Sequence, residues 1–165
     1  MERVKVYHVW WEKFQIDEIY KKQNIGLYQV YGDHIVYGRN VLLYIGQTKR
    51  DINMRLKEHD DFNETNINTN SLMYYFGEIY KSDDVNEGNL EKIIDEVETI
   101  LLKSHYPSYN SNEIKGLIWQ KDYYNSIVLN WNNYGALLPE VSGLRFSSKY
   151  WDDWNKKAHP FRPTV

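Results

Sequence analysis

The sequence predicts an α+β fold, and three features of the 165-residue chain support this class. Two β-rich runs lie at residues 26–31 and 41–45, and a third follows at residues 71–80. A strongly amphipathic segment, "LEKIIDEVETILLKSHY", predicts a helix over residues 90–106. Short apolar runs separated by Asn, Gly and Pro predict additional strands after residue 113. The length suits one hydrophobic core with additions, so we expect a single domain over residues 1–165.

The first elements are a strand over "VKVYHVW" and a short helix over "FQIDEIYKK". The runs at 26–31 and 41–45 then predict two strands joined by a long excursion with Gly32 and Gly38 at its breaks. In the second run, strand alternation predicts that Leu43 and Ile45 share one face. Leu42 and Tyr44 are expected on the other face.

A second helix is predicted over "INMRLKEH", with Asp51 as its N-cap. The polar stretch "DDFNETNINTN" that follows fits a surface loop or a loop that reads a substrate. Pro107 ends the long helix. Beyond it, we expect short strands at "LIWQ", "SIVLNW", "ALLPEV" and "GLRF".

Composition excludes several classes of protein. The chain has no cysteine, so it can form neither a disulfide framework nor a thiolate zinc site. The N-terminus lacks the order of a signal peptide, and no apolar run approaches the roughly 18 residues of a membrane span. We therefore expect a cytoplasmic protein that is not inserted in a membrane.

Net charge and aromatic content leave the partner open. A net charge of −3 argues mildly against nucleic-acid binding, but the acidic residues are concentrated in residues 60–112, between two mildly basic segments. This distribution permits a local surface that faces phosphate. The 15 Tyr and 6 Trp side chains can stack on bases or fill a thin core.

Glu98 stands out on the predicted long helix. At about 100° per residue, it falls about 40° from Ile94, between that residue and Leu102 on the apolar side. Lys92, Glu96, Thr99 and Lys103 fall on the opposite side, which we expect to be solvated. A carboxylate on the core side must be paired, reach water or bind a metal, and the helical wheel does not choose among these.

Arg55 and His59 are four residues apart and share one face of the preceding predicted helix. That face lies beside the apolar stripe of Ile52 and Leu56. A guanidinium there could hold a phosphate bidentately and stabilise charge developing on it. A solvated arginine is the simpler alternative.

The order of these features resembles the GIY-YIG nuclease family from about residue 26 to residue 110. The matching elements are "GLY" ending at Tyr28, "YIG" beginning at Tyr44, "YIGQTKR" followed by "RLKEH", the helix with Glu98, and "PSYN" ending at Asn110. The interval from Glu98 to Asn110 and the pairing of Arg55 with His59 look most like the restriction-endonuclease branch. Two departures are a Leu in the first motif, tolerable at a buried aliphatic position, and an unusually long spacer over residues 29–43.

The resemblance implies a small mixed three-stranded sheet flanked by helices over residues 23–112. Residues 113–165 would then form an aromatic-rich β extension packed on this core. It also implies a DNA endonuclease that hydrolyses phosphodiester bonds with one divalent metal, Mg²⁺ or Mn²⁺. One carboxylate, with water and phosphate completing the shell, suits Mg²⁺. A restriction, repair or mobile-element role, the recognition sequence and a homodimer are left open.

The resemblance also implies roles for single residues. Glu98 would hold the metal, Arg55 would stabilise the phosphate, and Tyr28 would act as general base. Tyr44, His59 and Asn110 would position phosphate, water or Tyr28, and Lys49 and Arg50 would bind substrate.

An ordinary tyrosine pKa of about 10 makes ionisation at pH 7 cost about 4 kcal/mol, so a nearby cation is needed. Lys49 is a candidate for this cation, and a solvated turn lysine is the alternative.

Two other functions remain to be weighed. The chain could be a nucleic-acid-binding module that has the fold without catalysis, although Tyr28, Tyr44, Arg55 and Glu98 are all present. It could also be a domain whose aromatic surface binds carbohydrate or protein, which would make the ordered motifs accidental. Cleavage of plasmid DNA in the presence of a divalent metal would distinguish the endonuclease from both alternatives.

Overall fold

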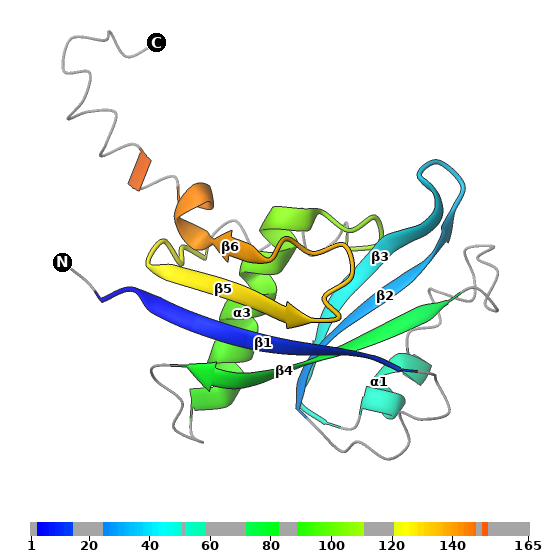
Figure 1. The fold of residues 1–165 in the computed structure, drawn as a ribbon, viewed down its shortest axis with the longest axis horizontal. Coiled ribbons are helices and arrows are strands. Elements are labelled where there is room, and N and C mark those ends of the chain that lie inside the picture. The colour runs from blue at the N-terminus through cyan, green and yellow to red at the C-terminus, as the bar shows by residue number, and fades with distance from the viewer. Residues whose placement is uncertain are drawn as a thin grey trace, which may run out of the picture.

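The computed structural model describes residues 3–14, 25–50, 52–58, 72–82, 89–110, 121–147 and 150–151. Its strands form one mixed six-stranded sheet in the order β3-β2-β4-β1-β5-β6 (Figure 1). The strands are β1 (Lys5–Phe14), β2 (Gly26–His34), β3 (Gly38–Thr48), β4 (Met73–Ser82), β5 (Ser126–Asn132) and β6 (Glu140–Ser142). The helices are α1 (Ile52–Glu58), α3 (Leu90–His105) and the 3₁₀ turn η5 (Gly143–Phe146). The predicted mixed α and β class agrees with this arrangement.

Residues 23–112 contribute three strands as expected, β2, β3 and β4, but these strands belong to a larger sheet because the N-terminal strand β1 pairs with β4. β1 pairs antiparallel with β4 on one side and parallel with β5 on the other. The inward side chains Tyr7, Val9 and Trp11 of β1 are buried in the main core. Strands from all three expected segments, before residue 23, within 23–112 and after 112, therefore share one sheet. β5 pairs with β1 as a further strand of this sheet and does not cover one of its faces.

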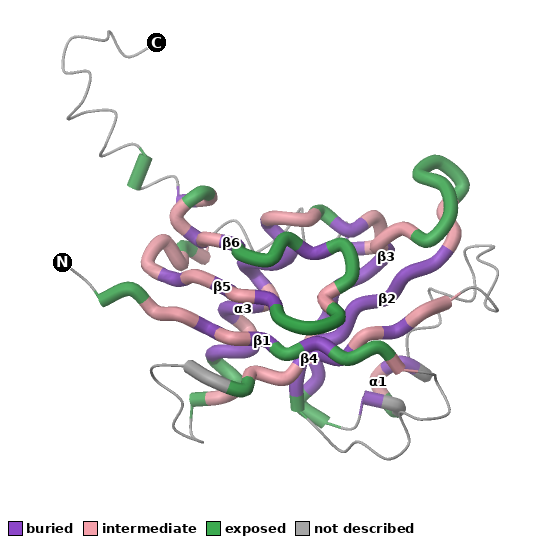
Figure 2. Tube along the Cα trace, viewed as in Figure 1, coloured by how far each residue is buried: buried purple, intermediate pink, exposed green. Residues whose placement is uncertain are grey.

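The predicted long excursion between the second and third strands is a tight hairpin. β2 and β3 pair antiparallel from Gly26 and Thr48 almost to the turn, where His34 pairs with Gly38. The backbone N–H groups of Val36 and Tyr37 donate to Nδ1 of His34, at 3.1 and 3.2 Å. The turn projects from the sheet and its residues are exposed (Figure 2). The prediction failed because Gly32 is a buried strand residue and not a break.

A β-bulge changes the predicted faces of β3. Val30 pairs with Tyr44 and Tyr31 pairs with Leu42, so Leu43 is the extra residue. Ile45 and Tyr44 belong to opposite clusters, as strand alternation predicts. Leu42, however, packs against the cluster of Ile45. The bulge therefore places Leu42 on the face opposite to the expected one.

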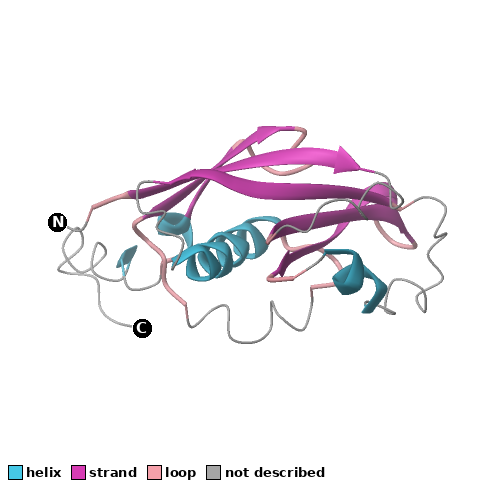
Figure 3. Cartoon of the chain, turned by 90° about the horizontal axis from the view of Figure 1, so that it is seen from below, coloured by secondary structure: helices cyan, strands magenta, loops and turns pink. Residues whose placement is uncertain are grey.

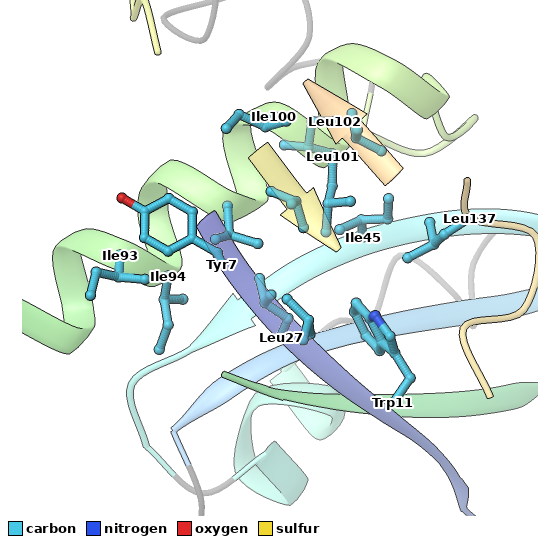
Figure 4. Packing of buried hydrophobic residues seen from close by; sticks show 14 residues of the cluster. Tyr7, Trp11, Leu27, Ile45, Ile93, Ile94, Ile100, Leu101, Leu102 and Leu137 are labelled. Atoms are coloured by element: carbon cyan, nitrogen blue, oxygen red, sulfur yellow. The ribbon is translucent and has the colours of Figure 1, made fainter. Parts of the chain in front are cut away.

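Two hydrophobic clusters occupy the two faces of the sheet. α3 packs on one face, where Ile94, Leu101 and other helix residues meet Trp11, Leu27 and Ile45 (Figures 3 and 4). The other face carries a second cluster that includes Ile52 and Leu56 of α1; its remaining buried members are Tyr28, Val30, Tyr44, Tyr74 and Phe76. Side-chain alternation along β2 therefore puts Leu27 under α3 and Tyr28 on the side of α1.

The bounds of the long helix agree with the prediction to within one residue, but its predicted solvent face does not. Tyr106 has φ 48° and ends α3, and Pro107 follows. Glu96, Thr99 and Lys103 are buried, although Lys92 is exposed as expected.

The buried charges on this side of α3 meet the start of the C-terminal extension and β1. The carboxylate of Glu96 accepts hydrogen bonds from Ser126 and from Lys5, the latter at 3.4 Å, and Lys103 donates to the carbonyl of Lys121. The helical wheel could not include these partners, because they are distant in sequence.

Several other predictions have mixed outcomes. β5 matches the strand predicted at "SIVLNW", only the end of "ALLPEV" is a strand, and "GLRF" forms η5 instead of a strand. Phe14 belongs to β1 and not to the predicted short helix. The rest of that helix, the Asp51 cap, the polar loop at 60–70 and the strand at "LIWQ" lie outside the described residues. None of the described helices is long and apolar enough to span a membrane.

Candidate active site

Tyr28 and Tyr44 lie side by side because the strands of the hairpin place both on the same face. Tyr28 pairs with Gly46, and Tyr44 lies two residues before that glycine on β3. Their ring centroids are 5.8 Å apart with an interplanar angle of 25°. A Cβ atom at Gly46 would lie 2.5 Å from the Tyr28 hydroxyl oxygen and 2.6 Å from the Tyr44 ring. Glycine at position 46 therefore lets the Tyr28 ring lie over β3, the edge strand of the sheet.

The Tyr28 hydroxyl is buried among polar groups. Its hydrogen-bond partners are the side chains of Tyr44 and Arg55. Burial raises the pKa of Tyr28 to about 12, against the opposing effects of the Arg55 charge and of these two hydrogen bonds. The negative charge of Glu98 raises the pKa further, by a smaller amount. The free protein therefore holds Tyr28 protonated at neutral pH.

α1 supplies Arg55 from the side of the sheet opposite to α3. Ile52 and Leu56 anchor this short helix in the second hydrophobic cluster, and both are buried. Arg55 lies between them in sequence and is half-buried. This anchoring carries the guanidinium to the Tyr28 hydroxyl.

Glu98 reaches the same region from α3. It is half-buried, and its Oε2 accepts a hydrogen bond of 2.8 Å from Nε2 of Gln47 on β3. Gln47 pairs with Leu27 and faces α3, whereas Tyr28 faces the other side. The negative charge of Glu98 nevertheless acts on the Tyr28 hydroxyl, across the edge strand β3.

Asn110 holds the edge strand through its side-chain amide. Its side chain is buried, and its Oδ1 accepts from the backbone N–H of Ile45 at 2.9 Å. Its Nδ2 donates to the carbonyl of the same residue at 2.9 Å. The backbone N–H of Tyr109 adds a bond to the carbonyl of Leu43. These bonds give Asn110 a positioning role for the strand that carries Tyr44, and its predicted contact with substrate stays a prediction.

Lys49 does not act as the cation beside Tyr28. Its ammonium is exposed and pairs with Glu91 at 2.9 Å, which raises the pKa of Lys49. Arg55 supplies the positive charge at Tyr28.

Arg50 is exposed after β3, and its backbone N–H donates to the Thr48 hydroxyl at 3.2 Å. A substrate contact for Lys49 or Arg50 stays a prediction. His59 lies outside the described residues, and its role stays a prediction as well.

Sequence reasoning missed Gln47. Its position three residues after Tyr44 in "YIGQT" was a usable signal, since alternation on β3 turns it toward the helix that carries Glu98.

The donor atoms at Glu98 fit a hard divalent cation. The Oε1 atom of Gln47 is buried and has no hydrogen-bond partner among the described residues. A carboxylate and an amide oxygen are both ligands that Mg²⁺ accepts, with water and substrate oxygens for the rest of the shell. No group of three or more His, Asp or Glu side chains that could form a protein cage for a metal occurs in the described part of the chain. A cation here would therefore depend on Glu98 as its single acidic ligand.

No protein-family model matches the chain, and no curated protein or solved structure matches it either.

Proposed function

We propose that the chain is a metal-dependent endonuclease that hydrolyses phosphodiester bonds in DNA. The observation that carries this proposal is the convergence at the edge of β3 of a buried tyrosine hydroxyl, an arginine and a carboxylate. They come from three separate elements, β2, α1 and α3, and the Tyr28 hydroxyl interacts with both Arg55 and Glu98. A cation held by Glu98, Mg²⁺ or Mn²⁺, would supply Lewis-acid stabilisation of a phosphate.

Arg55 has two tasks in this proposal. Its guanidinium can donate two hydrogen bonds to a phosphate and stabilise the charge that develops as water attacks. It also lowers the pKa of Tyr28, a task for which the sequence had suggested Lys49. Ionising a hydroxyl with a pKa of about 12 at pH 7 costs about 7 kcal/mol. In this proposal, Tyr28 is protonated in the free protein and orients the attacking water. The positive charge of a bound divalent cation would lower the pKa of Tyr28 and let it act as a base.

The burial of Tyr28 also favours a second candidate function. A hydroxyl with no exposed surface and a raised pKa is a poor base, as expected of a DNA-binding module without catalysis. Both functions predict DNA binding that weakens as salt is added. They differ in whether the bound DNA is cut.

Plasmid cleavage tests the proposal. Supercoiled plasmid and a branched duplex are incubated with the protein in Mg²⁺, in Mn²⁺ and in EDTA. We expect wild type to nick or linearise DNA only with metal. Glu98→Gln keeps the shape of the side chain and removes its charge, and we expect it to be slower by at least about 100-fold, since even second-shell partners of metal sites cost about 10–100-fold.

Glu91→Gln is the matched control. Glu91 lies on the same helix, is exposed and pairs with Lys49, so its neutralisation is expected to leave the cleavage rate within about two-fold. Equal rates for wild type and Glu98→Gln on both DNA forms would contradict the endonuclease. Salt-dependent binding without cleavage would then favour the binding module.

A further inference from the structure

Gln47 is a hydrogen-bond partner of the proposed metal ligand and has no role in the function argued so far. Its Nε2 donates to Oε2 of Glu98 at 2.8 Å, across the interface between β3 and α3. The side chain is held at this interface because β3 turns alternate residues toward α3. The donated bond limits rotation of a carboxylate that would otherwise have several rotamers.

The amide oxygen of Gln47 gives a second indication that a ligand binds beside Glu98. Oε1 is buried beside this carboxylate and has no hydrogen-bond partner among the described residues. A buried acceptor without a partner is uncommon in folded proteins and calls for an explanation. The amide orientation follows from the donor role, because exchanging N and O would set Oε1 against the Glu98 carboxylate. The unpaired atom is therefore an oxygen, an acceptor suited to water or to a hard cation.

We propose that Gln47 positions Glu98 for a divalent cation and that its Oε1 accepts a hydrogen bond from the hydration shell of that cation. This inference rests on the proposed function, since it takes Glu98 to be the metal ligand. The amide then has two separate tasks, with its nitrogen orienting the carboxylate and its oxygen contacting the hydrated ion. Gln47 is a positioning residue and does not touch the scissile phosphate in this scheme.

Binding of Mn²⁺ to the full chain without DNA tests the inference independently of cleavage. Water-proton relaxation enhancement during a Mn²⁺ titration reports binding even when it is weak. Gln47→Leu removes both amide atoms, and we expect the apparent Kd for Mn²⁺ to rise about 10–100-fold. Gln47→Glu loses the donor but keeps an oxygen and adds charge, so we expect a Kd equal to or lower than that of wild type.

Gln29→Leu is the matched control. Gln29 lies on the neighbouring strand, pairs with Ile45, and also has a buried amide atom, Nε2, with no partner among the described residues. Its Oε1 accepts a hydrogen bond of 2.7 Å from the hydroxyl of Tyr31, which is not part of the candidate site. We expect this variant to lose stability and to keep the wild-type Kd for Mn²⁺. Circular dichroism establishes that every variant is folded at the titration temperature.

The outcomes separate the two proposals. If Gln47→Leu binds Mn²⁺ as tightly as wild type while Glu98→Gln has lost binding, the inference about Gln47 is wrong and the metal site stands. If Gln47→Leu and Gln47→Glu are weakened alike, the oxygen has no part in binding and the inference is also wrong. If Glu98→Gln binds Mn²⁺ as wild type does, the metal assignment in the proposed function has failed instead.

Discussion

At the scale of single residues, the candidate site depends on two small details of β3. Gly46 leaves room for the Tyr28 ring, and a larger side chain would meet the hydroxyl at 2.5 Å. Gln47, the next residue, faces the opposite side and reaches Glu98. One dipeptide on the edge strand thus connects the tyrosine pair on one face to the carboxylate on the other. In the motif "YIGQTKR", the structure therefore explains Gly46 and Gln47 as well as Tyr44.

The raised pKa of Tyr28 predicts a loss of stability at alkaline pH. The folded protein holds the pKa at about 12, above the value of 10.0 expected when the chain is unfolded. The resulting stabilisation is complete below pH 10 and is lost as pH rises from 10 toward 12, because the unfolded state ionises first. Across that window we expect wild type to lose about 2–3 kcal/mol more than Tyr28→Phe, by urea unfolding at several pH values. Parallel pH curves for the two proteins would contradict a raised pKa at this tyrosine.

At the scale of elements, Asn110 shows how the segment after α3 fixes the edge of the sheet. Its side-chain amide makes the pair of hydrogen bonds that a neighbouring strand would make, both with the backbone of Ile45. This explains why a polar side chain with only 1% of its surface exposed is tolerated there. It also joins the end of α3, which carries Glu98, to the strand that carries Tyr44.

Replacing Asn110 is expected to weaken both the fold and the site. Asn110→Ala leaves the N–H and C=O of Ile45 without their partner, which costs about 2–4 kcal/mol in the free energy of unfolding. If the proposed function holds, cleavage should fall as well, because the strand under Tyr44 loses its support. Urea unfolding and the plasmid assay measure the two effects. Asn125→Ala removes a single exposed bond to the carbonyl of Arg3 and serves as the control, with an expected loss below about 1 kcal/mol.

A result opposite to this expectation would be informative. If Asn110→Ala unfolded at the same urea concentration as wild type and yet lost cleavage, Asn110 would contact substrate after all. That result would support the predicted substrate contact of this residue.

The local elements were predictable to different degrees, and the reasons are physical. α3 is long enough for its apolar periodicity to define both ends, and Pro107 marks the stop. The hairpin was misjudged because a glycine inside a strand looks like a turn signal in sequence, as Gly32 did. The bulge at Leu43 could not be foreseen, since one extra residue leaves the apolar pattern almost unchanged.

The motifs single out residues of the candidate site, but the contacts between distant segments that set their chemistry were not predictable. Tyr28 interacts with Tyr44, Arg55 and Glu98, which the motifs also single out, and the roles of these residues stay predictions. The pairing of Lys49 with Glu91 and the burial of Tyr28 depend on contacts between distant segments. Such contacts have no signal in a single sequence, which is why the pKa of Tyr28 and its cationic partner were misjudged.

At the scale of the whole molecule, the sheet joins segments that the motifs treat as separate. β1 lies between β4 and β5, so the strand that precedes the motif region occupies the middle of the sheet. Trp11 of β1 donates its indole N–H to Asn130 of β5 at 2.8 Å, and both residues are buried. Val128 of β5 belongs to the same core cluster as Leu27 and Ile45. Residues 26–110, which carry the motifs, therefore share their main hydrophobic core with β1 and β5, near the two ends of the described chain.

This arrangement predicts that residues 23–112 alone will not fold, although they contain every motif that resembles a nuclease. The fragment lacks Tyr7, Val9, Trp11 and Val128, and it would expose the β4 edge and the inner surface of α3. Losing several large core side chains at once costs more than the roughly 5–15 kcal/mol that stabilises a typical domain. We expect the fragment to give a non-cooperative thermal transition by circular dichroism, whereas residues 1–165 unfold cooperatively. A cooperative transition in the fragment, with dispersed amide signals by NMR, would show instead that β1 and β5 are additions to an independent core.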